Sequence, residues 1–167
     1  RAAGGTAQAL AVLIADMIRR ELNVGHYQPT DPEVERVKEE FGLYRGNLQY
    51  RPSPHEIDEI VRACPVMING ESTERIECAG YGNVRNIDEP RIRGGVLLVI
   101  GEGMCLKAPK IQKHTERLNM PGWGFIAKFA SRGKEEESSE SEGFKSQQIP
   151  PITKFMKDII AGRPVFG

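Results

Sequence analysis

The sequence is poor in several features that define common classes of protein. Its 167 residues include three cysteines, aromatic residues make up 7%, and the 23 basic and 23 acidic residues leave a formal net charge of zero. Taken as a whole, a neutral chain is neither a strongly basic nucleic-acid-binding module nor an acidic tail protein. No apolar run approaches the roughly 18 residues of a membrane span, which excludes an integral membrane protein. The length allows one domain, or one domain and a tail.

The cysteines and carboxylates form no recognisable reactive cluster. Cys64, Cys78 and Cys105 are odd in number and include no C-x-x-C pair, which is typical of a reducing compartment. We therefore expect reduced, mostly buried thiols in a cytoplasmic protein. The histidines lie at no finger-like spacing from these cysteines, and the aspartates are scattered without a D-x-D pair. We predict no catalytic residue, no metal ligand and no cofactor in this chain.

The segment from Val96 to Gly103 invites a nucleotide-binding interpretation, because an apolar run precedes Gly101-Glu-Gly103. A dinucleotide fingerprint needs a third glycine where this chain has Leu106, and a phosphate loop needs Gly-Lys-Ser/Thr. Both motifs fail. The glycines instead favour a helix whose backbone packs closely against a neighbour.

Helical periodicity is the clearest pattern in the first half. We predict a helix over 6–23, and two capping boxes, Thr30-Asp-Pro-Glu33 and Ser53-Pro-His-Glu56, predict shorter helices over 31–41 and 53–64. One apolar stripe should make the first helix the spine of the core. The stripe consists of Leu10, Leu13, Ile14, Met17 and Ile18.

The apolar run 96–100 is compatible with a buried strand or a buried helix. Apolar residues continue downstream at helical spacing, which favours a long helix over 95–118, kinked or broken near Pro109. Trp123, Ile126 and Phe129 predict one more short helix.

The middle of the chain has a different pattern. A β-rich run ends at an Asn69-Gly70 turn, alternation follows over 75–79, and residues 84–87 are compatible with a third strand. We predict a small antiparallel sheet within 66–93. The expected fold is therefore a helix-rich α+β domain.

The domain organisation follows from composition. Residues 1–131 form the predicted α+β domain, and 132–148 form a mobile acidic linker because they have no apolar period. Residues 149–167 are expected to form a terminal helix. The chain does not begin with Met, and we interpret it as a fragment of a longer protein.

Basic residues give a nucleic-acid signal. Arg91 and Arg93 precede a glycine pair, and further cations recur at three- and four-residue spacing, which places them on one helix face. Such a stripe could follow phosphates. The predicted nucleic-acid-binding residues are Arg91, Arg93, Lys107, Lys110, Lys113 and Arg117, and the alternative is an ordinary solvated face. A KH module would need a G-x-x-G clamp, which the turn segments lack.

An ordered set of short motifs resembles the N-terminal part of the large subunit of archaeal family D DNA polymerase, also called DNA polymerase II. The similarity covers most of 1–131 and resumes at 150–167. The motifs are Gly4-Gly-Thr-Ala-Gln-Ala-Leu10, Tyr50-x-Pro-Ser-Pro-His-Glu56, Gly70-Glu-Ser-Thr-Glu74, Arg93-Gly-Gly95, Gly101-Glu-Gly103, Lys107-Ala108 and Gly162-Arg-Pro-Val-Phe-Gly167.

The resemblance implies a DNA-directed DNA polymerase, a heterodimer whose small subunit carries the 3′–5′ exonuclease. The implied partners are that small subunit, DNA and, through other regions, a sliding clamp, but no membrane. The family's magnesium-dependent polymerase centre lies downstream, and its N-terminal region is described as KH-like. The chain would then be a non-catalytic, DNA-facing structural part of the enzyme. The alternative is a free-standing nucleic-acid-binding or protein-interaction module.

Overall fold

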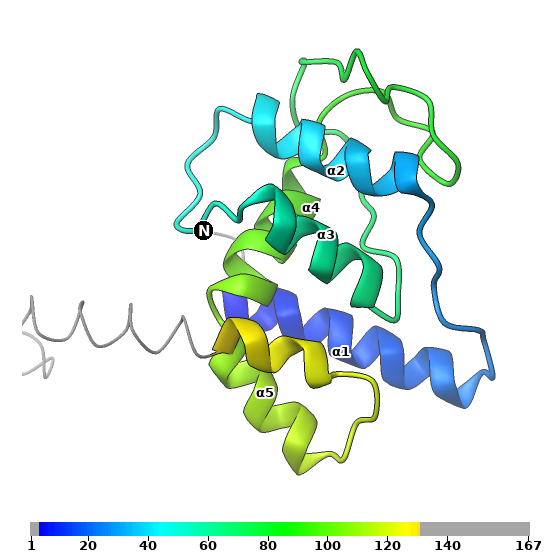
Figure 1. Ribbon diagram of the computed structural model, residues 1–167, viewed down its shortest axis with the longest axis vertical. Coiled ribbons are helices and arrows are strands. Elements are labelled where there is room, and N and C mark those ends of the chain that lie inside the picture. Colours follow the sequence, from blue (N-terminus) through cyan, green and yellow to red (C-terminus); the bar gives the residue numbers. More distant parts are fainter. Residues whose placement is uncertain (1–3, 131–167) are drawn as a thin grey trace, which may run out of the picture. The chain divides into compact units, whose positions relative to one another are not determined.

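A computed structural model describes residues 4–130, all of which lie in the first of the chain's two units (Figure 1). None of the helices in this range is long and apolar enough to cross a membrane. The predicted linker 132–148 and terminal helix 149–167 lie outside the described residues. In chain order the elements are α1 (Gly5–Glu21), α2 (Asp31–Leu43), α3 (Pro54–Ala63), α4 (Gly94–Leu98), the π-helix η1 (Val99–Cys105), α5 (Ala108–Arg117) and the 3-10 helix η2 (Gly124–Ile126).

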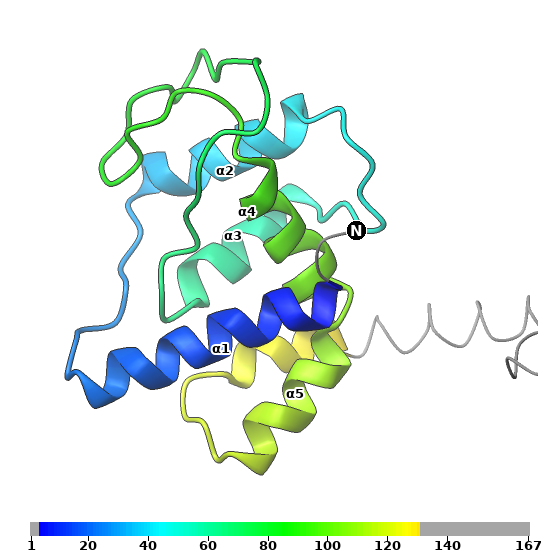
Figure 2. The ribbon, with the colours of Figure 1, turned by 180° about the vertical axis from the view of Figure 1, so that it is seen from behind.

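The consecutive helices α4, η1 and α5 form the centre of the domain. They contact α1, α2, α3 and η2, and α4 lies near α2 while α5 lies at the other end (Figures 1 and 2). Apolar side chains from all these elements form one continuous buried cluster. Its large, fully buried members include Leu13, Ile57, Leu97, Met104, Ile111 and Trp123.

The two predicted capping boxes are confirmed. The backbone N–H of Thr30 donates to the Glu33 carboxylate over 2.7 Å at the start of α2. The backbone N–H of Ser53 donates to the Glu56 carboxylate over 2.8 Å at the start of α3. Each box satisfies donors that the first helical turn would otherwise leave unpaired.

Residues 96–100 are helical, which decides between the two conformations open to the apolar run. The predicted long helix is present as α4, η1 and α5, with a break at Leu106 and Lys107. The break falls just before Pro109, which lies in the first turn of α5, where its missing N–H costs nothing.

The glycines of the failed nucleotide motif do provide close backbone packing, as predicted. A Cβ atom at Gly103 would lie 3.3 Å from the backbone nitrogen of Ala9, and one at Gly5 would lie 2.4 Å from the carbonyl oxygen of Glu102. A Cβ at Gly101 would lie 2.7 Å from the carbonyl oxygen of Tyr50. The backbone of α1 and that of η1 therefore meet without side chains between them.

The predicted stripe of α1 is only partly buried. Leu13 is buried as expected, whereas Ile14, Met17 and Ile18 are exposed. The buried face is instead formed by Ala9, Val12, Leu13 and Asp16. The helix is rotated relative to the prediction because Asp16, a charged residue, is the one that points inward.

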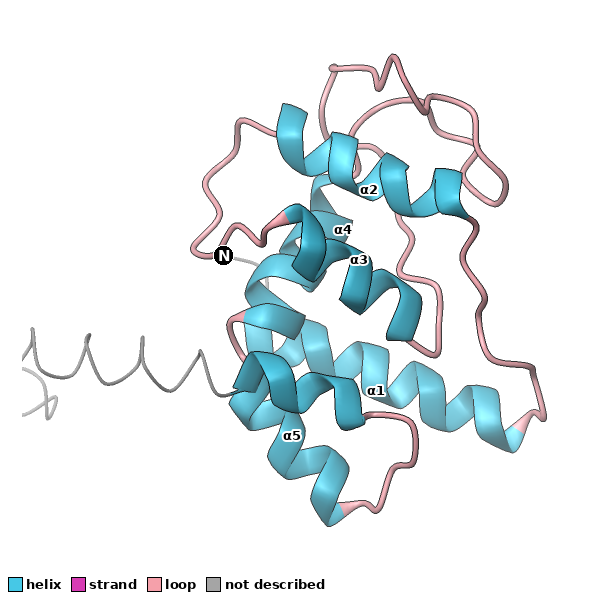
Figure 3. Ribbon diagram, in the orientation of Figure 1, coloured by secondary structure: helices cyan, strands magenta, loops and turns pink. Residues whose placement is uncertain are grey.

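The predicted antiparallel sheet is wrong, and with it the α+β class: every regular element within residues 4–130 is a helix, and none is a strand (Figure 3). Two isolated bridges remain within 66–93, Glu77 with Arg91 and Val84 with Ile87. The predicted Asn69-Gly70 turn is absent as well, and a strand needs a longer ladder of backbone hydrogen bonds than this loop has. Here many carbonyl groups bond to side chains instead.

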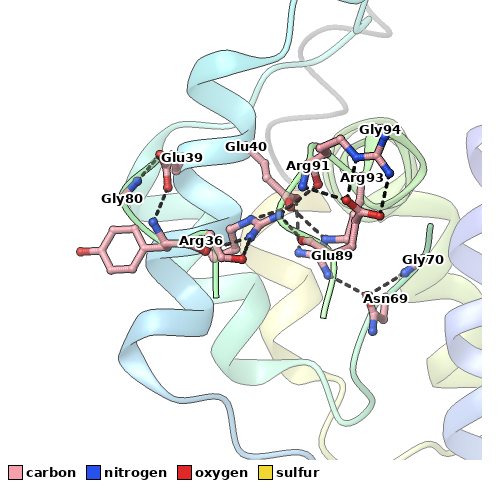
Figure 4. Close-up of polar contacts among 12 residues, drawn as sticks. Arg36, Glu39, Glu40, Asn69, Gly70, Gly80, Glu89, Arg91, Arg93 and Gly94 are labelled. Atoms are coloured by element: carbon pink, nitrogen blue, oxygen red, sulfur yellow. Dashed lines mark hydrogen bonds and ion pairs between the residues drawn. The ribbon is translucent and has the colours of Figure 1, made fainter. Parts of the chain in front are cut away.

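The Arg36 side chain replaces the missing ladder. Its guanidinium donates to the carbonyl oxygens of Tyr81, Gly82, Glu89 and Arg91 over 2.7–3.0 Å. Its Nε donates to Glu40 over 2.8 Å, so all five N–H donors of this fully buried side chain are used. Arg36 thus attaches the loop to α2 through four backbone carbonyl groups (Figure 4).

The Glu40 carboxylate connects Arg36 to a second buried cation. Arg93, at the start of α4, donates to it over 2.9 and 3.2 Å and also donates to the side chain of Asn69 over 2.7 Å. Beside them, the Glu39 carboxylate accepts from the backbone N–H groups of Gly80 and Tyr81. The buried cluster Arg36–Glu40–Arg93 therefore joins α2, the loop and α4 (Figure 4).

Replacing Glu40 should destabilise the domain strongly. The variant Glu40→Gln keeps the shape but leaves two buried guanidinium groups without a counter-charge, and we expect a loss of about 3–5 kcal/mol in the free energy of unfolding. Chemical denaturation measures it. The control Glu35→Gln, on the same helix, removes a solvent-accessible ion pair with Lys38 and should cost about 0–1 kcal/mol. Equal losses in the two variants would contradict the structural role of the cluster.

Candidate nucleic-acid interface

Three of the downstream cations of the predicted site lie on α5, and the fourth, Lys107, is its N-cap residue. Ala108, Ile111 and Thr115 are buried, and the helical repeat places Lys110, Lys113 and Arg117 on the opposite, exposed side. Lys107 precedes the helix and is half-buried. The face that these four cations form is called the α5 basic face below.

The α5 basic face has little negative charge nearby on its own helix. Among residues 4–130 no ion pair forms with any of its four cations, and the only carboxylate on α5, Glu116, accepts a hydrogen bond from Gln112 over 2.8 Å. At about 1.5 Å per residue the face extends roughly 15 Å along the helix axis. That length is sufficient for contact with several successive phosphates of one strand.

Arg91 and Arg93 belong to a different part of the molecule. Arg91 is exposed and bonds to Glu89 over 2.9 Å, and this hydrogen bond lowers the pKa of Glu89 to about 2. Arg93 is only 1% exposed and pairs with Glu40, so its guanidinium does not reach the surface. Arg93 is the N-cap residue of α4 and Arg91 comes two residues earlier, whereas α5 lies at the other end of the central helices. The structure therefore brings four of the six predicted residues together.

Sequence reasoning missed two buried ionic clusters. One is Arg36–Glu40–Arg93, and a possible signal was an Arg and a Glu four residues apart on the apolar side of α2, beside Val37 and Phe41. The other surrounds Asp16, which is fully buried and accepts from Arg19, Arg20 and the Trp123 indole over 2.8–2.9 Å. No local pattern indicates that contact with Trp123, 107 residues away.

The Asp16 cluster determines how α1 lies on the core. Burial alone would raise the pKa of Asp16, but the hydrogen bonds from Trp123, Arg19 and Arg20 outweigh burial and hold the pKa below its ordinary value. The Arg20 guanidinium also donates to the carbonyl of Pro121 over 2.6 Å. These contacts attach the second half of α1 to the segment that follows α5.

The described residues offer no set of ligands for a catalytic metal. Within 4–130, no group of three or more His, Cys, Asp or Glu side chains lies close enough together to hold an ion. The magnesium that the resemblance implies for the parent enzyme therefore has no fitting site in this part of the chain. Cys64 and Cys78 are buried, and burial raises the pKa of each thiol to about 11. Such thiols are poor nucleophiles and poor metal ligands at neutral pH.

The fold and its surface define a helical domain with one basic outer helix. Its sequence matches, over residues 1–132, the family described as "DNA polymerase II large subunit DP2, N-terminal". The chain belongs to this family.

Three curated relatives show the extent of the match. The DNA polymerase II large subunits of Methanosarcina barkeri and Methanococcoides burtonii are 48% and 47% identical, over 100% of this chain and 15% of each relative. The large subunit from Archaeoglobus fulgidus is 44% identical over the whole chain and 14% of its own length. The chain thus spans about one seventh of the length of the relatives that it matches.

Acid should destabilise the domain through the Asp16 cluster. Because the pKa of Asp16 is lower in the folded state, the unfolded state binds the extra proton first, and the stabilisation disappears as pH falls from about 3.8 through the lowered pKa. We expect Asp16→Asn and Trp123→Phe each to make the free energy of unfolding depend less on pH in this range. Urea unfolding between pH 5 and pH 2.5 tests this, and wild-type pH dependence in both variants would refute it.

Proposed function

We propose that this chain is a non-catalytic part of the large subunit of a replicative DNA-directed DNA polymerase, and that the α5 basic face contacts DNA. The family match over residues 1–132 supports the assignment to a polymerase large subunit. The names of the relatives supply the enzyme class, and a large subunit implies a small one, which by resemblance carries the 3′–5′ exonuclease.

The arrangement of the carboxylates supports a non-catalytic role. Two-metal phosphoryl transfer needs acidic side chains that converge on one point. The buried carboxylates of the described residues are each used to hold structure: Asp16 binds Trp123, Glu33 and Glu56 cap helices, and Glu40 binds two arginines. We therefore expect polymerase chemistry to lie in the rest of the subunit.

The separation of charge in the domain supports a DNA contact. Arg36 and Arg93 are buried, whereas the cations of α5 point outward and lie close together. Local charge density rather than net charge determines contact with phosphates, since Coulomb interactions are screened within about 10 Å at 0.1 M salt. A face with four cations predicts weak, salt-sensitive binding without sequence preference.

The isolated chain should not incorporate nucleotides. A primer-extension assay with magnesium or manganese is expected to show no product, since the described residues offer no converging carboxylates. The positive control is a full-length large subunit with its small subunit. Incorporation by the chain that persists through repeated purification would contradict a non-catalytic role.

Removing the α5 basic face should weaken DNA binding and reduce its salt dependence. Four phosphate contacts correspond to a slope of roughly −3.6 in a plot of log K against log salt, or about a hundredfold loss of affinity between 50 and 200 mM. The triple variant Lys110→Ala, Lys113→Ala, Arg117→Ala should have a slope near −1 (roughly 0.9 per remaining contact). Fluorescence anisotropy with a labelled primer–template measures both.

The matched control removes the same charge elsewhere. Arg45, Arg75 and Arg85 are exposed outside α5, and changing all three to alanine should leave most of the slope in place. If the control weakened binding as much as the α5 variant, general electrostatics rather than the α5 basic face would be responsible.

A further inference from the structure

The outer face of α1 is almost entirely apolar. Of the exposed residues of this helix only Glu21 is charged, and the others are Ala7, Ala11, Ile14, Ala15, Met17 and Ile18. The large side chains lie toward the end of the helix, where Ile14 is 55% exposed and Ile18 is 54% exposed. Leu22 and Val24 extend the surface beyond the helix, at 68% and 55%. Residues 7–24 on this side form the α1 outer face.

Other helices of the domain present charged groups to solvent. The exposed side of α5 carries Lys110, Lys113 and Arg117, and that of α3 includes Arg62. Five of the eight large hydrophobic residues that are exposed among residues 4–130 belong to the segment 14–24. A contiguous exposed apolar surface of this kind marks an interaction site.

The helix cannot turn this face inward. Asp16 is held by Trp123 on the opposite side, and Arg20 is held by the carbonyl of Pro121. At the other end Gly5 lies against the backbone of Glu102, where even a methyl group would not fit. The rotation of α1 is therefore determined at both ends.

The size of the face indicates what covers it. It consists of fewer than ten residues, whereas a stable interface between separate proteins involves roughly 20–30 residues on each side. A small apolar face is sufficient when its partner is on the same polypeptide, because tethering gives a high effective concentration. The relatives match this chain over only about 15% of their length, so most of their polypeptide lies outside the match.

We propose that the α1 outer face packs against an apolar surface of the same large-subunit polypeptide, contributed by the part beyond the matched region. The inference uses the membership in a longer large subunit and is independent of the DNA contact on α5. The face would thus attach this domain to the rest of the subunit, with Ile14, Ile18 and Leu22 as its central side chains.

Cysteine protection tests the proposal. The variant Ile18→Cys places a thiol in the middle of the face, and His55→Cys places one on α3, where the native side chain is 81% exposed. Maleimide labelling at pH 7 is followed by peptide mapping, in the 167-residue chain and in a full-length large subunit that contains it. The native Cys64 and Cys78 are buried, so their resistance to labelling verifies that each variant is folded.

We expect both introduced thiols to react rapidly in the 167-residue chain. In the full-length subunit Ile18→Cys should react at least tenfold more slowly, at every protein concentration and without the small subunit, while His55→Cys stays reactive. Rapid labelling of Ile18→Cys in both proteins would overturn the proposal. So would protection that disappears on dilution, which indicates a second copy, protection that requires the small subunit, or equal protection at both positions. The labelling test involves no measurement of DNA binding. A result that refutes the proposal for α1 therefore leaves the proposed DNA contact of α5 untouched.

Discussion

The buried guanidinium group of Arg36 holds together α2, the loop 66–93 and, through Glu40, the start of α4. Taking an arginine out of water is costly, and the cost is offset only when every donor finds an acceptor. Arg36 meets that condition, because Glu40 and the carbonyls of Tyr81, Gly82, Glu89 and Arg91 accept from it. The loop 66–93 can therefore remain ordered without strands. Through Glu40 the same network reaches Arg93 and fixes where α4 begins.

Because two arginines are buried, the net charge of the chain does not describe the charge on its surface. Balanced totals of acidic and basic residues suggest a surface without strong fields. The fold, however, places Arg36 and Arg93 inside and leaves the cations of α5 outside. A neutral protein can thus present a local basic face, and short-range contact with phosphates depends on that face rather than on the total.

The sequence predicted those parts of the fold that depend on neighbours in the chain. Capping boxes and apolar periodicity are local, and the helices that they predicted within residues 4–130 are present. The prediction of a sheet was wrong because the alternation at 75–79 reports only on side chains. The loop carbonyl groups accept hydrogen bonds from Arg36, which lies some 45 to 55 residues earlier in the sequence. In α1, two overlapping sets of apolar residues recur at helical spacing: the predicted stripe, and the set that is buried, which includes Ala9, Val12 and Leu13. The choice between them depended on Asp16 and Trp123, and that contact has no local signature.

The two outer faces of the domain are oriented by one backbone contact. Gly5 and Gly103 let α1 lie directly on η1, and η1 continues through a short break into α5. The rotations of α1 and α5 are therefore both fixed relative to η1. This arrangement exposes the apolar side of α1 and the basic side of α5. Larger residues at these glycines would separate α1 from η1 and change the angle between the faces. The proposed protein contact on α1 and the proposed DNA contact on α5 both require a constant angle, and the direct backbone contact between α1 and η1 keeps that angle constant.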